Sequence, residues 1–550
     1  MVFLKWMFLV TVAVIYLAKY AESHHYHHSH HHSHHSHHSH QHQKEDCAKS
    51  RSPRCRKMDD ERRTHPRPRK GEKSRFQPSE KTSTYWQNLG YNHVKEKINR
   101  KLNTNKAKNI VFFIGDGMSI PTLFASRVAM GGEEKQLSFE KFPYTGLAKT
   151  YCIDAQVADS ACTGTAYMTG VKTNFFTLGV NGQVTMGDCK SANNPSTHTE
   201  SIAKWALDAG KSAGIVTTTT VTHASPGASY AHVAERMWED DFMVRQSGCD
   251  PNETTDIARQ LINGPVGSRF KVILGGGRGH MRDARFPDEE GGFGFRNDSR
   301  DLISEWLNDG KRNKRYVWNR NDLLSTPSNT EYLLGLFENS HMQFRLESIA
   351  KKTEETEPTL EEMTRSAINI LKKNDKGFFL FVEGGRIDHG HHYTIPRAAV
   401  GETIEFQKAI QTARDMLSEE DTLIVVSSDH SHTMSISGYP TRGNDIFGKS
   451  DRWLAEDGLT YTTLSYANGP MSSNQYPRAG RVDPDNVDLS QWNSNFPFLV
   501  PTQMETHAGD DVGVFASGPY AHLFTGVMEQ SHLPHLMAYA ACIGRGPRAC

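Results

Sequence analysis

Residues 378–392 read FFLFVEGGRIDHGHH, a short apolar run followed at once by acidic residues and histidines. Such a run is typical of a strand that is buried on both faces. In open α/β sheets ligands bind beyond the carboxyl ends of the strands, which is where Glu383, Asp388 and His392 fall. Because Asp388 and His392 are four residues apart, one helical turn can bring both to a single metal ion. The stretch therefore predicts a buried strand with a metal site at its carboxyl end.

The same pattern recurs along the chain. Similar apolar runs predict buried strands at residues 109–114, 213–218, 271–274, 422–426 and 512–516. Helical spacing appears at residues 201–209, 255–262 and 361–371. This alternation predicts an α/β fold with a doubly wound, mostly parallel central sheet flanked by helices. Residues 439–503, rich in Gly, Pro, Asn, Ser and Tyr, break the pattern and are interpreted as an inserted surface subdomain.

The N-terminal region differs in composition from the rest. Residues 1–23 combine one early lysine, an apolar run and small residues, which predicts a signal peptide. Residues 24–84 are expected to be a disordered tail, first His-rich and then basic. The 13 histidines in residues 24–42 can be a solvated spacer or a zinc-collecting segment. Residues 85–550 have a globular composition and are predicted to form the catalytic domain.

Charge and cysteine content narrow the function and the compartment. The formal net charge of zero hides a basic tail, because residues 76–550 carry a net charge of −8. An acidic body argues against a nucleic-acid-binding protein. The apolar run of residues 6–17 is shorter than the roughly 20 residues of a membrane-spanning helix, and the sequence shows no apolar C-terminal tail of the kind that signals a lipid anchor. We therefore expect a secreted protein without a stable membrane anchor, whose eight cysteines are candidates for disulfides.

Three further segments carry possible chemistry. Asp116 lies in a Gly-Asp-Gly turn after residues 109–114, and residues 428–432, SDHSH, follow another apolar run. A Gly-Asp-Gly sequence alone is more often a simple turn, but two acidic and His-rich clusters after strands favour a multinuclear hydrolytic site. Ser160 lies among small residues in VADSACTGT, residues 157–165, and is a candidate nucleophile. A serine hydroxyl needs a base or a metal to become reactive, so Ser160 and the metal site are expected to act together.

Five segments together resemble the animal alkaline phosphatase family. They are FIGDGM (113–118), the Ser160 segment, VEGGRIDHGHH (382–392), SDHSH (428–432) and ETHAGDDV (505–512), and the match runs in order from about residue 85 to residue 550. The resemblance implies hydrolysis of small-molecule phosphate monoesters to an alcohol and inorganic phosphate. It also implies a phosphoserine intermediate on Ser160, two zinc ions, one magnesium ion and a homodimer.

The resemblance also implies a role for each matching residue. One zinc would be held by Asp388, His392 and His507, the second by Asp116, Asp429 and His430, and magnesium by Asp116, Ser225 and Glu383 with His223 in its outer shell. Nitrogen-rich groups suit zinc and oxygen-only groups suit magnesium. Arg236 would hold the phosphate with its planar fork, and Asp159 would orient it, although local sequence alone favours an ordinary surface arginine.

The sequence also bears on disulfides, on a calcium site and on glycosylation. It implies disulfides between Cys189 and Cys249 and between Cys542 and Cys550, and leaves Cys47, Cys55, Cys152 and Cys162 open. Phe337, Glu338 and Glu357 match part of a calcium site, but the remaining ligand falls near Arg285, where a cation cannot serve. Asn252 and Asn297 begin Asn-X-Thr/Ser sequons and are predicted glycosylation sites.

Two other functions compete with this interpretation. The first is a phosphodiesterase or nucleotide pyrophosphatase of the same superfamily, which Arg236 and the magnesium ligands disfavour. The second is a secreted metal-binding protein with an inert body and a working His-rich tail, which the full set of predicted ligands disfavours.

Overall fold

The computed structural model describes residues 52–53, 55–57 and 75–550, apart from residues 453 and 476–479. The chain divides into two compact units, residues 1–67 and 68–550, and the fold described below is that of the second. The predicted signal peptide, the His-rich segment and Cys47 lie outside the described residues.

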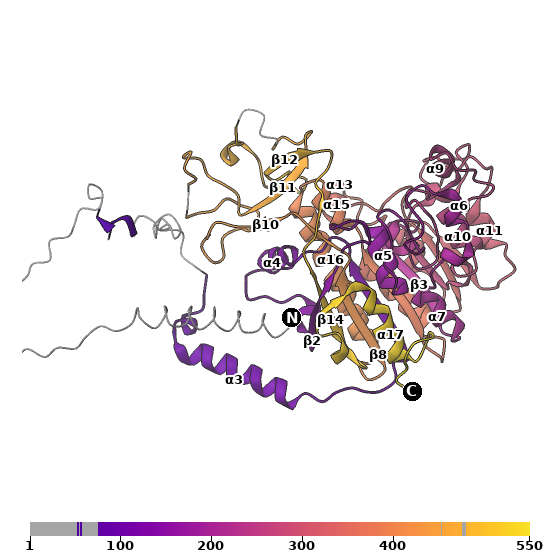
Figure 1. Ribbon diagram of the computed structural model, residues 1–550, viewed down its shortest axis with the longest axis horizontal. Coiled ribbons are helices and arrows are strands. Elements are labelled where there is room, and N and C mark those ends of the chain that lie inside the picture. Colours follow the sequence, from indigo (N-terminus) through magenta and orange to yellow (C-terminus); the bar gives the residue numbers. More distant parts are fainter. Residues whose placement is uncertain (1–51, 54, 58–74, 453, 476–479) are drawn as a thin grey trace, which may run out of the picture. The chain divides into compact units, whose positions relative to one another are not determined.

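A ten-stranded sheet forms the centre of the second unit (Figure 1), in the order β15-β2-β14-β8-β1-β7-β3-β4-β6-β5. The seven strands from β8 to β5 run parallel, whereas β14 is antiparallel to both of its neighbours. The predicted α/β fold with a mostly parallel sheet is therefore confirmed. The strands are β1 Asn109–Gly115, β2 Tyr144–Lys149, β3 Ser212–Thr220, β4 Val272–Gly276, β5 Lys314–Val317, β6 Tyr332–Leu336, β7 Phe378–Gly384, β8 Thr422–Ser428, β14 Val512–Ser517 and β15 Gly526–Glu529.

The six strands predicted from apolar runs correspond to β1, β3, β4, β7, β8 and β14, each of which lies between two other strands of the sheet. The missed strands are β2, β5, β6 and β15. In β2 buried and exposed residues alternate, and β15 is largely exposed, so neither contains a continuous apolar run. A central parallel strand is buried on both faces and is easy to recognise, whereas a strand near the edge of the sheet gives a weaker signal.

Helices cover both faces of the sheet, and β1 shows how the faces divide. Ile110, Phe112 and Ile114 belong to a hydrophobic cluster that includes residues of α5, α7, α10, α11 and α17. Val111 and Phe113 belong to a second cluster with residues of α4, α14 and α16. The helices are α3 Ser83–Asn99, α4 Ile120–Ala129, α5 Ser160–Thr169, α6 Cys189–Ala192, α7 Ile202–Asp208, α8 Ala224–Gly227, α9 Asp241–Gln246, α10 Ile257–Asn263, α11 Leu302–Leu307, α12 Arg320–Leu324, α13 Arg345–Lys351, α14 Leu360–Leu371, α15 Arg386–His392, α16 Pro396–Met416 and α17 Leu533–Ala541.

Local sequence sets the ends of the helices that matter for the site. The Asp159 carboxylate caps α5 by accepting hydrogen bonds from the backbone N–H groups of Ala161 and Cys162, and α5 ends at Gly170, which has a φ of 78°. Thr359 and Glu362 form a capping box at the start of α14. The predicted helices at residues 201–209, 255–262 and 361–371 are present as α7, α10 and α14.

A separate three-stranded sheet lies within the C-terminal part of the chain, outside the main sheet in Figure 1. It contains β10 Ser435–Ile436, β11 Leu464–Pro470 and β12 Phe498–Thr502. Its apolar side chains, among them Leu464 and Phe498, cluster with Ala125 of α4 and Val400 of α16. The small sheet thus begins just before the predicted insertion of residues 439–503 and packs on helices next to the site.

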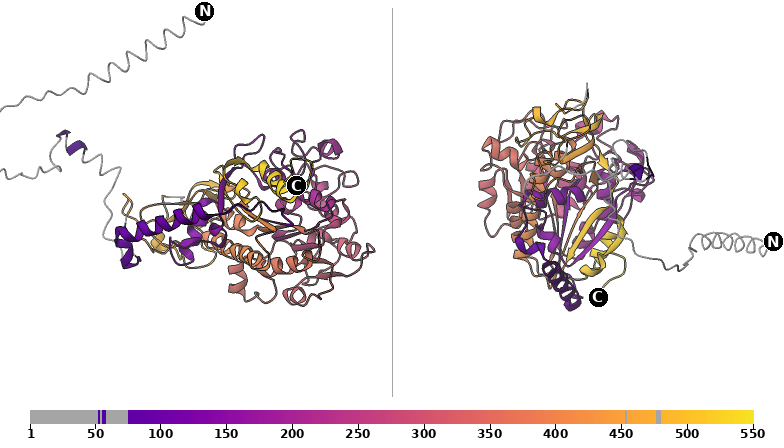
Figure 2. Two further views of the ribbon diagram at one scale, coloured as in Figure 1. Left: turned by 90° about the horizontal axis from the view of Figure 1, so that it is seen from below. Right: turned by 90° about the vertical axis from the view of Figure 1, so that its left-hand side faces the viewer.

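Helix α3 has no buried residue and lies along the outside of the second unit (Figure 2). It exposes Trp86, Leu89, Tyr91, Val94 and Ile98 by more than half of each side chain. Among the described residues, no helix is both long and apolar enough to span a membrane.

Three disulfides join described cysteines. Two are the bridges that the family resemblance implies, Cys189–Cys249 and Cys542–Cys550. The third, Cys152–Cys162, closes a short loop directly before and across the start of α5.

Candidate functional site

The predicted site residues gather beyond the carboxyl ends of β1, β7 and β8. Strand β1 pairs in parallel with both neighbours, and Gly115 is in register with Gly384 and with Ser428. The residues that follow these strands, including Asp116 and Asp429, therefore emerge side by side. A short antiparallel pair, β9 Ser431–His432 and β13 His507–Ala508, brings His507 to the same edge from later in the chain.

Asp388, His392 and His507 bring two ring nitrogens and one carboxylate close together. The Nε2 atoms of His392 and His507 are 3.1 Å apart, and each lies 3.2 Å from a different oxygen of Asp388, His392 from Oδ2 and His507 from Oδ1. A tetrahedral zinc ion with ligands at roughly 2.0–2.1 Å requires separations of about 3.3 Å between ligand atoms. The separations between these donor atoms are close to that value, so the three side chains fit a shared zinc ion.

Hydrogen bonds at the other ring nitrogens fix both imidazoles in the ligating form. His392 donates from Nδ1 to the Glu505 carbonyl at 2.5 Å, and His507 donates from Nδ1 to the Ala158 carbonyl at 2.7 Å. With Nδ1 protonated in each neutral ring, both Nε2 atoms carry lone pairs that point into the same space. Two lone pairs at this distance repel one another unless a cation or a proton lies between them, so the group fits a metal ion.

Asp116, Asp429 and His430 form a second group around Ser160. His430 Nε2 lies 3.1 Å from the Asp429 carboxylate and 3.5 Å from the Asp116 carboxylate. One oxygen of Asp429 accepts hydrogen bonds from the backbone N–H groups of Gly117 and His430, which orients the other oxygen toward the histidine. All three side chains are fully buried. A buried set of two carboxylates and one imidazole is a donor set that suits zinc.

Asp116, Glu383 and Ser225 form a third group that contains only oxygen donors. Both oxygens of Asp116, Oε1 of Glu383 and Oγ of Ser225 are buried and have no hydrogen-bond partner among the described residues. The other Glu383 oxygen accepts hydrogen bonds from Thr217 at 2.5 Å and Thr219 at 3.1 Å. Buried oxygens without partners are costly, and an all-oxygen set suits magnesium. Asp116 belongs to this group and to the second one.

The carboxylates of Asp116 and Glu383 are buried without enough neighbouring positive charge to keep their pKa values at the usual level. Burial raises the pKa of Glu383 to about 7. Burial and the neighbouring carboxylates of Asp429, Asp388 and Glu383 raise the pKa of Asp116 well above its usual range. Divalent cations would reverse these shifts by stabilising the charged carboxylates. The raised pKa values of Asp116 and Glu383 therefore fit the second and third groups to metal ions, whereas, against the effect of burial, His392 and His432 hold the pKa of Asp388 in the first group well below its usual range.

Ser160 is the first residue of α5 and is almost fully buried, with its Oγ 3.1 Å from His430 Nε2. A helix N-terminus stabilises negative charge, which favours the alkoxide form of this serine. The His430 Nδ1 atom faces the Ser431 carbonyl at 3.4 Å and not a carboxylate. The arrangement is therefore not a Ser-His-Asp triad, and the neighbour of Ser160 is instead the group that includes Asp116 and Asp429.

Arg236 points into the site, contrary to what its local sequence favours. Its guanidinium donates to Asp159 at 3.1 Å and to Nε2 of His223 at 3.0 Å, and it lies 5.8 Å from the centre of the Phe176 ring. Burial and the charge of Arg236 hold the pKa of His223 well below its usual range, so His223 is neutral and accepts this hydrogen bond. The Nδ1 atom of His223 has no partner among the described residues. His223 thus links Arg236 to the oxygen-only group.

His432 and Glu505 are part of the site although the sequence reasoning gave them no role. Fully buried His432 lies 2.6 Å from Asp388 and 2.5 Å from Glu505. Burial opposes its charge, but Glu505 and Asp388 outweigh burial and raise the pKa of His432 to about 10. His432 is thus a cation that fixes the Asp388 carboxylate. Both residues stand in quoted motifs, yet sequence spacing alone cannot distinguish a ligand from the residue that supports it.

Of the residues in the partial calcium match, Glu338 and Glu357 lie close together. The position near Arg285 adds no third carboxyl group to them. Burial and Glu338 raise the pKa of Glu357 to about 9, and Gln343 donates hydrogen bonds to both residues. Phe337 is buried next to Glu338. Arg285 is largely exposed and forms an ion pair with Asp283 at 2.6 Å. The sequence objection to a calcium ligand at Arg285 therefore stands.

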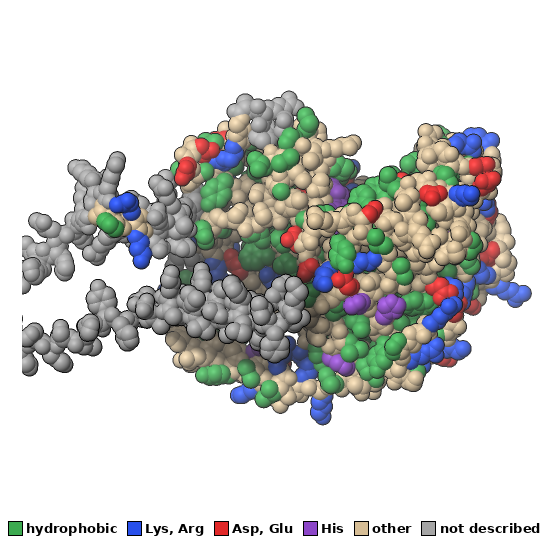
Figure 3. Space-filling model, in the orientation of Figure 1, with side chains coloured by type: hydrophobic (Ala, Val, Ile, Leu, Met, Phe, Trp, Pro, Cys, Tyr) green, Lys and Arg blue, Asp and Glu red, His purple; other side chains and the backbone are tan. Residues whose placement is uncertain are grey.

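The two sequons lie on the surface. Asn252 and Asn297 are exposed, whereas Thr254 of the first sequon is buried. On the face shown in Figure 3, acidic side chains lie among the Lys and Arg side chains, which is unlike the continuous basic surface of a nucleic-acid-binding protein.

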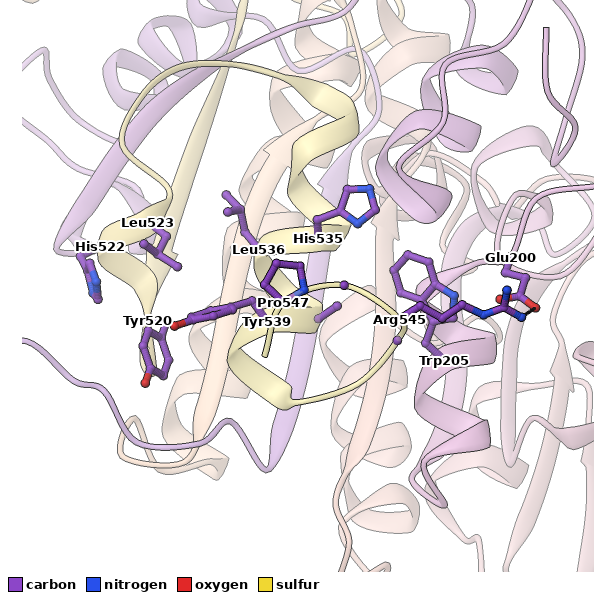
Figure 4. A pocket seen from close by; sticks show the side chains of 13 residues that line it. Glu200, Trp205, Tyr520, His522, Leu523, His535, Leu536, Tyr539, Arg545 and Pro547 are labelled. Carbon is purple, nitrogen blue, oxygen red and sulfur yellow. Dashed lines mark hydrogen bonds and ion pairs between the residues drawn. The ribbon is translucent and has the colours of Figure 1, made fainter. Parts of the chain in front are cut away.

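An apolar pocket of about 510 Å³ lies elsewhere, around α17 and the C-terminal segment (Figure 4). Trp205, Tyr520, Leu536 and Tyr539 contribute to its lining, and Glu200 and Arg545 lie at one side of it. It contains none of the residues of the three ligand groups, nor Ser160 or Arg236.

Comparisons with known proteins agree with the site. The family model described as alkaline phosphatase matches residues 107–543. A membrane-bound alkaline phosphatase of Bombyx mori is 49% identical over 459 residues, which cover 81% of this chain and 82% of that protein. The human tissue-nonspecific alkaline phosphatase is 43% identical over 492 residues, covering 86% of this chain and 91% of that protein. The solved structure of Thermus thermophilus alkaline phosphatase superposes with a TM-score of 0.56 at 21% identity, covering 81% of this chain and 94% of that one, and so agrees in fold.

Proposed function

The chain belongs to the alkaline phosphatase family, and from this premise we propose that it hydrolyses phosphate monoesters through a phosphoserine on Ser160. The supporting observation is that one sheet edge brings Ser160 together with Arg236 and three groups of side chains that can ligate metal. The proposed cofactors are two zinc ions, held by Asp388, His392 and His507 and by Asp116, Asp429 and His430, and one magnesium ion, held by Asp116, Ser225 and Glu383.

The side chains of the protein have distinct proposed roles. A phosphate monoester is a dianion that repels an anionic nucleophile, and the bound cations supply the positive charge that offsets this repulsion. Arg236 holds two phosphate oxygens in its planar fork, in an orientation set by Asp159 and His223. His432 keeps Asp388 in place, and the carbonyls of Ala158 and Glu505 keep His507 and His392 in their ligating tautomers.

The proposed reaction has two steps. Ser160 Oγ forms a bond to phosphorus while the bond from phosphorus to the ester oxygen breaks, and the alcohol leaves with a proton from solvent as the serine proton is released to solvent. Water then attacks phosphorus, the bond from phosphorus to Ser160 Oγ breaks, and inorganic phosphate is released as Oγ regains a proton. Each step exchanges one oxygen at phosphorus for another, so no oxidant or reductant is needed.

The proposed specificity for monoesters is tested by comparing p-nitrophenyl phosphate with bis-p-nitrophenyl phosphate on the full chain loaded with zinc and magnesium. Arg236 binds two oxygens, and a diester has one fewer charged oxygen to offer. We expect kcat/KM for the monoester to exceed that for the diester by at least about 10³-fold, because the contacts to this charged oxygen are lost. A preference for the diester would instead support the phosphodiesterase alternative.

The metal-binding alternative is tested by deleting residues 24–75. Intact hydrolysis with reduced metal uptake supports the enzyme and assigns the uptake to the tail. Absence of hydrolysis in both forms supports a binding protein with an inert body. We assign no calcium to the pair Glu338 and Glu357, because Arg285 stands where the family resemblance places a further ligand.

We also propose a secreted homodimer in which α3 contributes to the interface. The exposed apolar side chains of α3 favour a partner surface, and three disulfides fit an oxidising compartment. In the same proposal, residues 1–23 are removed, residues 24–84 remain as a tail whose last two residues begin α3, residues 439–503 form an inserted subdomain, and Asn252 and Asn297 carry glycans.

Sedimentation velocity of the protein collected from the medium of expressing cells tests the dimer. We expect two copies per particle for the parent. A Trp86→Asp/Val94→Asp variant should sediment as a single copy, because burying two carboxylates at an apolar interface is costly. Asn92→Asp on the same helix is the matched control and should stay dimeric. A double variant that keeps the parent mass would exclude this face of α3 from the interface.

A further inference from the structure

Residues 152–162 form a covalently closed loop that leads into the nucleophile. Cys152 follows the end of β2, Cys162 lies in the first turn of α5, and their disulfide spans a Cα–Cα distance of 5.8 Å. Both cysteines are 2% exposed. The family resemblance did not imply this bridge, and the proposed reaction gives it no role.

Three consecutive residues of this loop each serve a different part of the site. The Ala158 carbonyl accepts the hydrogen bond that fixes His507, at 2.7 Å. Asp159 pairs with Arg236 at 3.1 Å. Ser160 follows directly as the nucleophile. A displacement of the loop would therefore disturb a metal ligand, the phosphate-binding arginine and the attacking oxygen at once.

The loop also forms hydrogen bonds to the turn at residues 173–176, whose Phe176 ring faces Arg236. Ile153 donates from its backbone N–H to the Thr173 carbonyl at 3.0 Å, and the Asp154 carboxylate accepts from the Phe175 N–H at 2.8 Å. Asp159 accepts from the Phe176 N–H at 3.0 Å. Phe176 has a φ of 68°, which is uncommon for a residue other than glycine, and its ring faces Arg236. The position of this turn thus depends on the loop.

Packing alone constrains the loop weakly. Most side chains from Tyr151 to Val157 are exposed, and the buried part is a small cluster of Cys152, Ala158 and Cys162 with Ala155 against it. The cysteines supply most of that cluster. We infer that the Cys152–Cys162 disulfide is a positioning element of the reaction, which keeps Ser160, Arg236 and His507 in register. This inference rests on the proposed phosphoserine mechanism.

The test compares two variants of the full metal-loaded chain, each of which lacks one disulfide. Cys152→Ala/Cys162→Ala removes the bridge, and Cys542→Ala/Cys550→Ala removes a remote bridge with a similar sequence separation, 8 residues instead of 10. The chain-entropy contribution of a crosslink varies with the logarithm of loop length, so the two losses should destabilise the fold similarly. Steady-state kinetics on p-nitrophenyl phosphate are measured well below the melting temperature, together with zinc content.

We expect the first variant to lose about 10- to 100-fold in kcat, because small misplacements of reacting groups are costly, and to show a higher KM. The second variant should stay within about twofold of the parent in both constants. Equal kinetics for both variants and the parent, with lower melting temperatures only, would overturn the inference. A parallel Ser160→Ala variant keeps the two hypotheses apart, because its full activity would refute the mechanism and not merely the role of the disulfide.

If Cys152→Ala/Cys162→Ala does not fold, the inference is tested on the parent protein by reducing its disulfides. A water-soluble trialkylphosphine breaks the S–S bond by giving two electrons and becomes the phosphine oxide, while the sulfurs take protons from water. Alkylation and peptide mass spectrometry then show which bridge has opened. Activity that falls in step with the opening of Cys152–Cys162 supports the inference, and full activity after that bridge has opened overturns it.

Discussion

Ser160→Ala should lower kcat for p-nitrophenyl phosphate by at least about 10³-fold, because removing a nucleophile removes the covalent step itself. Ser160 is buried at the N-terminus of α5, and its Oγ is the only atom lost. Asp116, Asp429 and His430 remain, so zinc content and melting temperature should stay close to those of the parent. The measurement is a steady-state rate normalised to zinc content.

A buried helical serine away from the site provides the control for this variant. Ser348 of α13 is 3% exposed, and its hydroxyl donates to the Arg345 carbonyl. Ser348→Ala should leave kcat within about twofold, as a substitution without contact to the reacting groups. Acid quenching of the parent during turnover should trap phosphate on Ser160 and on no other serine. Activity of the Ser160 variant within tenfold of the parent would refute the phosphoserine mechanism.

Asp116→Asn should remove metal from two groups at once and lower activity by at least about 10²-fold, because an amide is a poorer metal ligand than a carboxylate. Asp116 is fully buried, and both of its oxygens lack partners among the described residues. The substitution keeps the shape of the side chain and removes its charge. Zinc and magnesium content measured beside activity should both fall.

Asp116→Asn should lower activity, but it should not lower the stability of the metal-free protein at alkaline pH. The raised pKa of Asp116 means that the folded metal-free chain binds the proton more tightly than the unfolded chain. Metal-free parent protein should therefore lose stability as the pH rises above the usual range of an aspartate. Asp116→Asn should lack this loss and should melt at a similar or higher temperature than the metal-free parent at pH 8.

Asp421→Asn is the matched control for this variant, since Asp421 precedes β8 and lies outside the three ligand groups. It should change neither metal content nor activity. Thermal melts with and without a chelator should differ strongly for the parent and weakly for Asp116→Asn. An Asp116 variant that keeps full zinc and magnesium would refute the shared role of this carboxylate.

The sequence predicted the centre of the sheet and the residues that follow its strands, because both signals are local. An interior parallel strand such as β7 must be apolar throughout, and Glu383 and Asp388 follow it within a few residues. The orientation of β14 had no such signal, because its apolar run is the same in a parallel and an antiparallel strand. Strands β2 and β15 near the edge lacked the run itself.

The supporting residues of the site could not be predicted because they act across long distances in the chain. His432 reaches both Asp388 and Glu505, and Cys152 pairs with one of seven other cysteines, so neither contact follows from spacing. The role of Arg236 came from family resemblance and ran against its local sequence. The positions of these supporting residues depend on tertiary contacts, whereas the strands could be recognised from local sequence patterns.

The place of His507 in the chain has a consequence for biosynthesis. Its β13 segment is synthesised long after β1, β7 and β8, yet it completes the group with Asp388 and His392. A growing polypeptide therefore lacks this three-ligand group until nearly all of the central sheet has left the ribosome. Under the proposed zinc assignment, this group can therefore capture metal only late in synthesis, and a chain truncated before His507 would lack one of its ligands.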